Sequence, residues 1–156
     1  MTNRGQIQQM LTDRYTALAG AHKYIFGFTM KGVVYKAIVD ESILPYVIKL
    51  DVASRGKGYC LRFRPTTAQK MTLMTYATPL CSEAFFNSVY ASSKYNKGEI
   101  FEKLVTEYFG QVWHKDSVPF MQCGDINVDG VEYQIKYQNA SFIDETTLHN
   151  IESHMA

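Results

Sequence analysis

A short segment near the C-terminal end, Gly124–Lys136, holds the residues whose types and spacing are best suited to chemistry. Its Asp129-Gly130 dipeptide lies between alternating runs and predicts a two-residue type I′ turn, which needs positive φ at both central positions. In the register that this turn sets, Asp125 lies opposite Gln134, and Lys136 follows two residues along the same strand. The pattern therefore predicts a hairpin with a carboxylate, an amide and an ammonium group on one face.

The opposite face of the predicted hairpin is apolar, and we expect it to pack on the core. It carries Ile126, Val128, Val131, Tyr133 and Ile135. On the polar face, carboxylate and amide oxygens are ligands that Mg²⁺ accepts, and a lysine beside them can hold or deprotonate a water molecule. Such a set suits phosphodiester cleavage, in which a divalent cation neutralises the phosphate and lowers the pKa of a bound water.

Helices are predicted before and after this hairpin. Asn96 is a suitable N-cap for a helix from about Lys97 to Phe109, which Gly110 ends. Its core stripe would consist of Ile100, Phe101, Leu104, Val105 and Phe109. Shorter helices are predicted over Ser82–Tyr90, capped by Ser82, and over Glu145–Glu152, capped by Asp144.

The first half of the chain predicts an amphipathic helix followed by a small antiparallel sheet. The helix would span Gln6–Leu18 and end near Gly20. The strand-forming runs are Tyr24–Val39, broken by a turn at Lys31-Gly32, and the pair Tyr46–Ala53 and Tyr59–Arg64 around Ser54–Gly58. The segment Met71–Thr78 is compatible with either a strand or a helix.

The two halves of the chain differ in charge, although the whole chain carries a net charge of only +1. Residues 1–90 hold 11 Lys and Arg against 5 Asp and Glu, a net +6, whereas residues 91–156 hold 5 against 10, a net −5. The window Ala53–Ser82 contains no carboxylate and suits a polyanion. Its five cations, the candidate nucleic-acid contacts, are Arg55, Lys57, Arg62, Arg64 and Lys70.

Several classes of protein are disfavoured by the composition. The 156 residues fit one ordinary domain, no apolar run is long enough for a membrane helix, and the polar start lacks the apolar core of a signal peptide. We therefore expect a cytoplasmic protein with no membrane partner. The three cysteines, without a CxxC pair, are expected to be small buried hydrophobes, and the four histidines show no metal-ligand spacing.

Three motifs together resemble the PD-(D/E)xK nuclease superfamily, which holds restriction enzymes, Holliday-junction resolvases and recombination exonucleases. They are Lys97-Gly98-x-x-Phe101-Glu102 in the predicted helix, Gly124-Asp125 before the turn and Gln134-x-Lys136 after it. The resemblance covers about residues 97–143. It implies a restriction-endonuclease-like α/β core, with a mixed central sheet flanked by helices and an α+β N-terminal extension.

The resemblance also implies roles for individual residues around a bound Mg²⁺ or Mn²⁺. Asp125 would be the central ligand, Gln134 would add its side-chain oxygen, and Ile135 its backbone carbonyl. Lys136 would hold or deprotonate the attacking water. Glu102 would bind the metal directly or through a water, and Glu99, one turn earlier, would face the same cavity. Gln138 lies on the Lys136 face and is expected either to orient Lys136 or to touch DNA.

This sequence departs from the family pattern in two places. Gln134 replaces the commoner acidic residue, which removes one negative charge from the metal site, and only 20 residues follow Lys136. The N-terminal half is therefore expected to supply missing core elements in a rearranged order. We interpret residues 1–90 as a basic region that contacts nucleic acid and residues 91–156 as the nuclease core, together forming one compact unit.

The leading hypothesis from the sequence is a divalent-metal-dependent DNA endonuclease. Its partner would be double-stranded or branched DNA, and a homodimer is expected because one site cuts one strand. Two alternatives stay open: a catalytically inactive nuclease fold that binds nucleic acid or protein, and an unrelated α+β interaction protein.

Overall fold

The computed structural model describes residues 23–40, 50–55, 58–114, 126–138 and 140–144, together with the isolated positions Gln6, Gln9 and Asp13. The structure describes only the backbone of residues 50–55, 58–63 and 140–144. The three isolated positions are helical, and the rest of the predicted Gln6–Leu18 helix lies outside the described residues. The predicted helix over 145–152 lies outside them as well.

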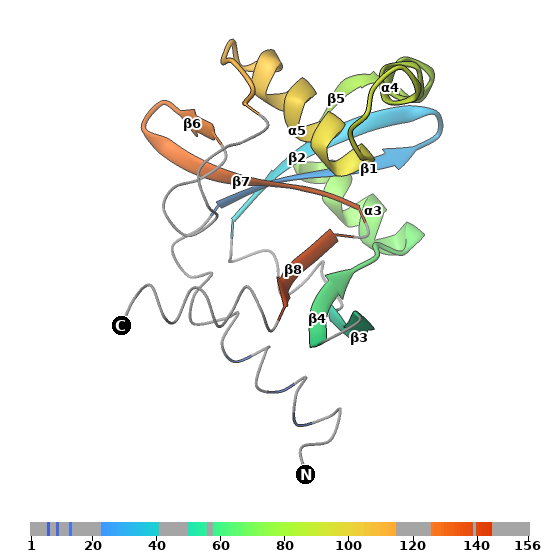
Figure 1. The fold of residues 1–156 in the computed structure, drawn as a ribbon, viewed down its shortest axis with the longest axis vertical. Coiled ribbons are helices and arrows are strands. Elements are labelled where there is room, and N and C mark those ends of the chain that lie inside the picture. The colour runs from blue at the N-terminus through green and yellow to red at the C-terminus, as the bar shows by residue number, and fades with distance from the viewer. Residues whose placement is uncertain are drawn as a thin grey trace.

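The main sheet has five strands in the order β5-β2-β1-β7-β6 (Figure 1). Strand β1 (Lys23–Met30) pairs antiparallel with β2 (Val33–Val39), which pairs antiparallel with the edge strand β5 (Ala77–Ser82). On its other side β1 pairs in parallel with β7 (Val131–Tyr137), the partner of the short strand β6 (Ile126–Val128). The sheet is therefore mixed, as the sequence predicts, and the fold is of the α/β type.

The parallel pairing of β1 with β7 corrects one expectation about the first half of the chain. Strands β1 and β2 do form the predicted hairpin, with Lys31 and Gly32 both at positive φ in the turn. They do not belong to a separate antiparallel sheet, however, because β1 lies at the centre of the sheet that holds β7. The N-terminal half thus supplies a central strand to the sheet of the C-terminal half.

A second, three-stranded sheet has the order β3-β4-β8. Strands β3 (Leu50–Arg55) and β4 (Gly58–Phe63) form the hairpin predicted around residues 54–58, and β8 (Ala140–Asp144) pairs with β4. Both sheets therefore combine strands from residues 1–90 with strands from residues 91–156.

Four helical segments of the described residues accompany the main sheet, and side-chain caps explain where most of them begin. Helix α3 (Thr67–Leu73) and the 3₁₀ helix η1 (Met74–Tyr76) lead into β5, so the segment left open by the sequence is helical first and extended afterwards. Ser82 caps α4 (Glu83–Ala91), and Asn96 forms a capping box with Glu99 at the start of α5 (Lys97–Tyr108). Both caps are the predicted ones, and Gly110 follows α5 at positive φ. None of the described helices is long and apolar enough to cross a membrane.

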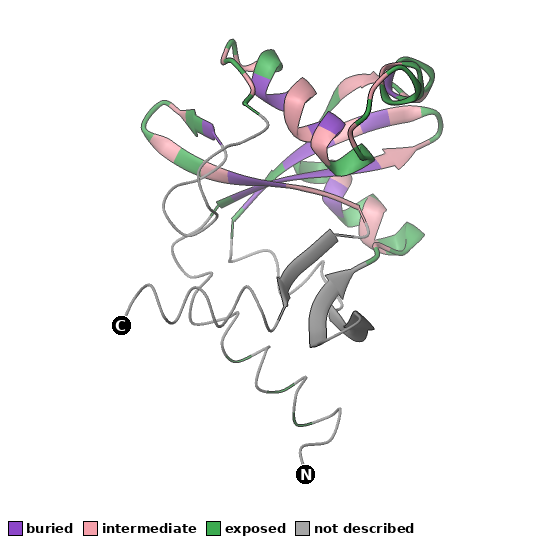
Figure 2. Ribbon diagram, in the orientation of Figure 1, coloured by how far each residue is buried: buried purple, intermediate pink, exposed green. Residues whose placement is uncertain are grey.

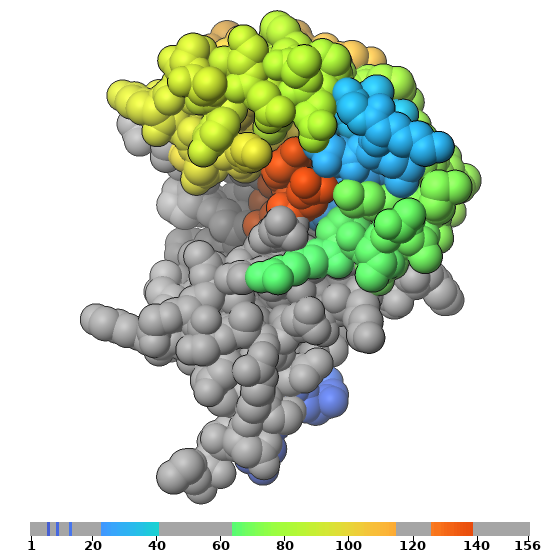
Figure 3. Space-filling model, turned by 90° about the vertical axis from the view of Figure 1, so that its right-hand side faces the viewer, coloured from blue at the N-terminus to red at the C-terminus, as the bar shows by residue number. Residues whose placement is uncertain are grey.

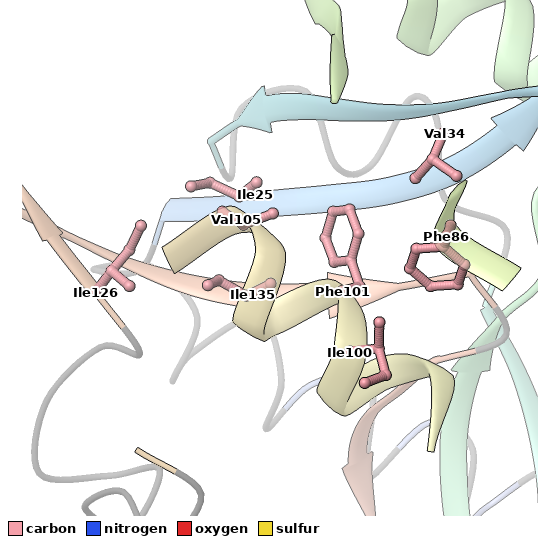
Figure 4. Close-up of a cluster of buried hydrophobic side chains, with 8 residues drawn as sticks. All are labelled: Ile25, Val34, Phe86, Ile100, Phe101, Val105, Ile126 and Ile135. Carbon is pink, nitrogen blue, oxygen red and sulfur yellow. The ribbon is translucent and has the colours of Figure 1, made fainter. Parts of the chain in front are cut away.

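Helices α4 and α5 cover one face of the main sheet and α3 lies on the other side (Figure 1). The core under α4 and α5 is drawn in Figure 4 and consists of Ile25, Val34, Phe86, Ile100, Phe101, Val105, Ile126 and Ile135. Ile126 and Ile135 belong to it, with Val128 and Tyr133 packed against it, so the apolar hairpin face is a core face as predicted. The other sheet face is also buried, notably at Tyr24, Phe26 and Phe28 (Figure 2).

Candidate functional site

The β6–β7 hairpin has the register that the sequence predicts. Ile126 pairs with Tyr133 and Val128 with Val131, so the turn consists of Asp129 and Gly130. Both turn residues have positive φ, 52° and 83°, as a type I′ turn requires. The Gly130 N–H donates to the side-chain oxygen of Asn127 at 3.0 Å, which stabilises the turn locally.

Gln134 and Lys136 lie on the sheet face that α5 does not cover. Side chains alternate along a strand, and Ile135 and Tyr137 point to the α5 side, where the Tyr137 ring lies 5.2 Å from that of Phe101. Gln134 is only 2% exposed and pairs with Tyr24 of β1, while Lys136 is half-buried opposite Phe26. The structure therefore places the predicted amide and ammonium groups next to each other on one face.

The backbone carbonyl of Ile135 points to the β6 side of β7. The Gln138 N–H donates to the Gly27 carbonyl of β1 at 2.9 Å. Because the N–H and C=O of one residue point the same way and alternate along a strand, Gln138 and Lys136 direct their backbone groups towards β1. Ile135 directs its own groups the opposite way, towards the side where β6 lies.

Glu102 is half-buried on α5, the helix that packs against Ile135 and Tyr137. Gln134 and Lys136 lie on the opposite face of the sheet, so the structure does not place Glu102 next to them.

Two further residues predicted for the site have structural contacts. The Glu99 carboxylate accepts the Asn96 N–H at 3.2 Å and so completes the cap of α5. The Gln138 side chain accepts from the Thr29 N–H at 3.3 Å and donates to the Thr29 hydroxyl at 3.4 Å. Gln138 therefore joins the ends of β1 and β7, a contact that the sequence did not indicate.

Asp125, the predicted central ligand, lies outside the described residues, one position before β6. Within the described ranges, no group of three or more His, Cys, Asp and Glu side chains could hold a metal ion. The predicted ligand set therefore depends on Asp125 together with Glu102 and the oxygens of Gln134 and Ile135.

The predicted nucleic-acid contacts have different environments. Lys57 lies outside the described residues, and Arg55 and Arg62 are described as backbone in the β3–β4 hairpin, where Asp51 is the position opposite Arg62. Arg64 is exposed just after β4. The Lys70 ammonium donates to the Thr29 carbonyl at 2.9 Å, which ties α3 to the end of β1.

Two pairs of lysine and tyrosine that the sequence reasoning missed lie where α4 ends and α5 begins. Lys97 Nζ lies 5.4 Å from the centre of the Tyr90 ring, and Lys94 Nζ lies 5.6 Å from that of Tyr95. The signal that could have found them is the run Tyr90–Lys97 itself, in which aromatic and basic residues alternate with small polar ones.

Among the described residues on the sheet face under α4, burial raises the pKa of two titratable groups, Tyr137 and Cys81. Burial raises the pKa of Tyr137 to about 12, with smaller contributions from Glu83 and then Cys81. Burial also raises the pKa of the half-buried Cys81 thiol, as expected for a cysteine that acts as a small hydrophobe. Both groups lie on the core side of the sheet and not with Gln134 and Lys136.

Comparison of the chain with protein-family models, with curated proteins and with solved structures finds no match.

Proposed function

We propose that this chain is a divalent-metal-dependent DNA endonuclease of the PD-(D/E)xK type, which hydrolyses phosphodiester bonds with Mg²⁺ or Mn²⁺. The observation that carries the proposal is the register of the β6–β7 hairpin. If this register continued by one residue, Asp125 would pair with Gln134, beside Lys136. A carboxylate, an amide and an ammonium group would then share one face, which is the arrangement that the motif needs.

The donor set fits a hard divalent cation. Asp125, Gln134, the Ile135 carbonyl and Glu102 offer only oxygen atoms, the ligands that Mg²⁺ prefers. The Ile135 carbonyl points to the side of β7 where β6 lies and where Asp125 would continue that strand, which supports a shared site there. When bound, the ion neutralises the scissile phosphate and lowers the pKa of a water.

The residues of the chain supply the rest of the chemistry. Lys136 holds the attacking water or, as the neutral amine, takes its proton, and its ammonium form stabilises the negative charge that develops on the phosphate oxygens. Asp125 would hold the divalent cation, whose positive charge binds and orients the reacting phosphate. Strand β1 pairs with residues 133–137 of β7 and so holds the backbone that carries Gln134 and Lys136 in a fixed geometry.

The core would be a rearranged restriction-endonuclease-like fold. In support, β7 has a parallel neighbour, and that neighbour, β1, comes from the N-terminal half. Double-stranded or branched DNA is the proposed substrate, with the cations of residues 53–82 as candidate phosphate contacts, and a homodimer would place one site at each strand.

A second candidate function is a catalytically inactive nuclease fold that binds nucleic acid or a protein. The specific observation in its favour is that Gln134 is neutral and 2% exposed, so the site lacks one negative charge at its most enclosed position. Such a protein would bind DNA equally well with and without a divalent cation.

Cleavage of labelled DNA separates the two functions. The purified protein is incubated with linear duplex, branched and single-stranded DNA in Mg²⁺, in Mn²⁺ and in EDTA. We expect metal-dependent cleavage that Lys136→Ala and Asp125→Asn remove and that Glu132→Gln, a change of an exposed carboxylate on the same strand, leaves intact. Metal-independent binding with no cleavage of any substrate would establish the inactive alternative.

A further inference from the structure

The connection between α4 and α5 presents two lysines on tyrosine rings. Tyr90 at the end of α4 is 38% exposed, and Lys94 and Lys97 are exposed beside it. The Lys97 and Lys94 ammonium groups lie 5.4 and 5.6 Å from the ring centres of Tyr90 and Tyr95, within the range of a cation–π interaction. We propose that this connection, residues 90–97, is a contact surface for single-stranded nucleic acid.

The rings position the positive charges without cancelling them. A carboxylate partner would neutralise an ammonium group, whereas a ring face restricts its position and leaves the charge to interact with a phosphate. Lys103 is ion-paired with Glu107 at 2.8 Å, whereas among the described residues neither Lys94 nor Lys97 has a carboxylate at ion-pair distance. The sequence agrees, since residues 84–98 contain no Asp or Glu.

The surface is preorganised by its own hydrogen bonds. The hydroxyls of Ser92 and Ser93 donate to the carbonyls of Val89 and Tyr90 at 3.1 and 3.0 Å, which ends α4. The Asn96 side chain accepts the Glu99 N–H at 2.8 Å, which starts α5. A rigid presentation reduces the conformational entropy lost when a strand binds.

Stacking distinguishes a single strand from a duplex as the occupant. An unpaired base offers its π face to a tyrosine ring while its phosphate meets a lysine, and this combination binds single strands with little sequence preference. A duplex offers phosphates but keeps its base faces stacked inside. The exposed Tyr90 ring beside the unneutralised Lys94 and Lys97 therefore matches a single-stranded segment better than a duplex, while the half-buried Tyr95 packs edge-on against Trp113.

The surface adjoins the end of β7. Phe101 in the second turn of α5 contacts Tyr137, and Figure 3 shows the orange end of β7 at the surface beside the yellow atoms of the α4–α5 connection and α5. A strand held on residues 90–97 would thus pass close to the strand that carries Lys136. The inference deepens the proposed function by favouring DNA with a single-stranded segment, and only this link to cleavage rests on that function.

Binding without a metal tests the surface independently of cleavage. The anisotropy of a labelled 12-nucleotide oligothymidine and of a 12-base-pair duplex is measured in EDTA over a series of salt concentrations. The double change Lys94→Gln plus Lys97→Gln should reduce the salt slope for the single strand by about 1.4, since each lost phosphate contact removes roughly 0.7. Lys103→Gln is the control. Lys103 lies in α5, as Lys97 does, but it is ion-paired with Glu107, so this change should leave the slope unchanged.

The tyrosine is tested by a matched pair of changes. Tyr90→Leu should weaken single-strand binding about tenfold because a stacking face is lost, while Tyr90→Phe should keep the wild-type affinity. Far-UV circular dichroism confirms that each variant is folded. No single-strand binding by the wild type, wild-type affinity in the double lysine variant, or equal losses for single strand and duplex would each overturn the proposal, even if duplex cleavage were found.

Discussion

The ring of Phe101 in α5 lies directly against the backbone of Gly27 in β1. A Cβ atom at position 27 would lie no farther than 2.7 Å from the Cζ, Cε1 and Cε2 atoms of this ring. Phe101 is fully buried and also packs on Tyr137 of β7. This contact sets the distance between the helix that carries Glu102 and the strand that carries Lys136.

Gly27→Ala is therefore expected to destabilise the fold by about 1–3 kcal/mol or more, because the core is overpacked where neither element can easily move. Unfolding in urea, followed by tryptophan fluorescence, measures the loss. Gly98→Ala is a suitable control, since its nearest neighbour is the Asn96 side-chain oxygen at 3.3 Å and the site lies in the first turn of a helix. The double variant Gly27→Ala plus Phe101→Leu should recover part of the stability, and the absence of recovery would show that the clash is not the cause.

Lys36 of β2 is 4% exposed, although it is charged. Its ammonium donates to the Thr78 hydroxyl of β5 and lies over the ring of Tyr108, the last residue of α5, where the helix dipole favours a cation. We expect Lys36→Met to be neutral or stabilising, because it removes a buried charge and keeps most of the volume. Lys36→Ala should cost about 2–4 kcal/mol through the cavity it leaves. Chemical denaturation of both variants checks the order, and a large loss in Lys36→Met would mean that the charge itself is needed.

Stability is expected to fall at alkaline pH because of Tyr137. Its pKa is raised to about 12 in the folded protein, against about 10 in the unfolded chain. Between these values the folded state binds more protons than the unfolded state, so stability falls as the pH rises through this window and is unaffected below it. Urea unfolding at pH 8 to 11.5 should show a smaller alkaline loss in Tyr137→Phe than in the wild type. Parallel curves for the two proteins would assign the loss to other groups.

Local signals explain which parts of the fold and site could be predicted. The Asp129-Gly130 turn fixes the β6–β7 register within a few residues, and Asn96 fixes the start of α5, so both predictions are confirmed. The pairing of β1 with β7 is not local, and nothing in either strand alone indicates its partner. The burial of Lys36 and the contacts of Gln138 with Thr29 depend on that pairing and on α5, so no local signal indicates them, and Gln138 was assigned to the candidate site instead.

Catalysis should depend on Asp125 far more than folding does. A carboxylate held near other acids is destabilising without a metal, so Asp125→Asn should be neutral or mildly stabilising in EDTA. Lys136→Ala should lower the cleavage rate about 10²- to 10⁴-fold, the usual contribution of a positioned proton-transfer group. Single-turnover cleavage and thermal melts of the same preparations measure both quantities. If each variant lost activity only in proportion to its loss of folded protein, the site would have been assigned wrongly.

Gln134→Glu is the change that best tests the metal site. Gln134 is 2% exposed, so a carboxylate there would be desolvated and should lower the melting temperature in EDTA. If Gln134 is a ligand, Mg²⁺ should reverse this loss, because a ligand that binds only the folded state stabilises it. The variant should then need less Mg²⁺ for half-maximal cleavage than the wild type. Gln138→Glu is the matched control, since the Gln138 amide bonds Thr29 near the end of β1, and its loss of stability should be the same with and without Mg²⁺. Equal melting temperatures of Gln134→Glu in EDTA and in Mg²⁺, with no cleavage by the variant or the wild type, would remove Gln134 from any metal site and leave the binding function in its place.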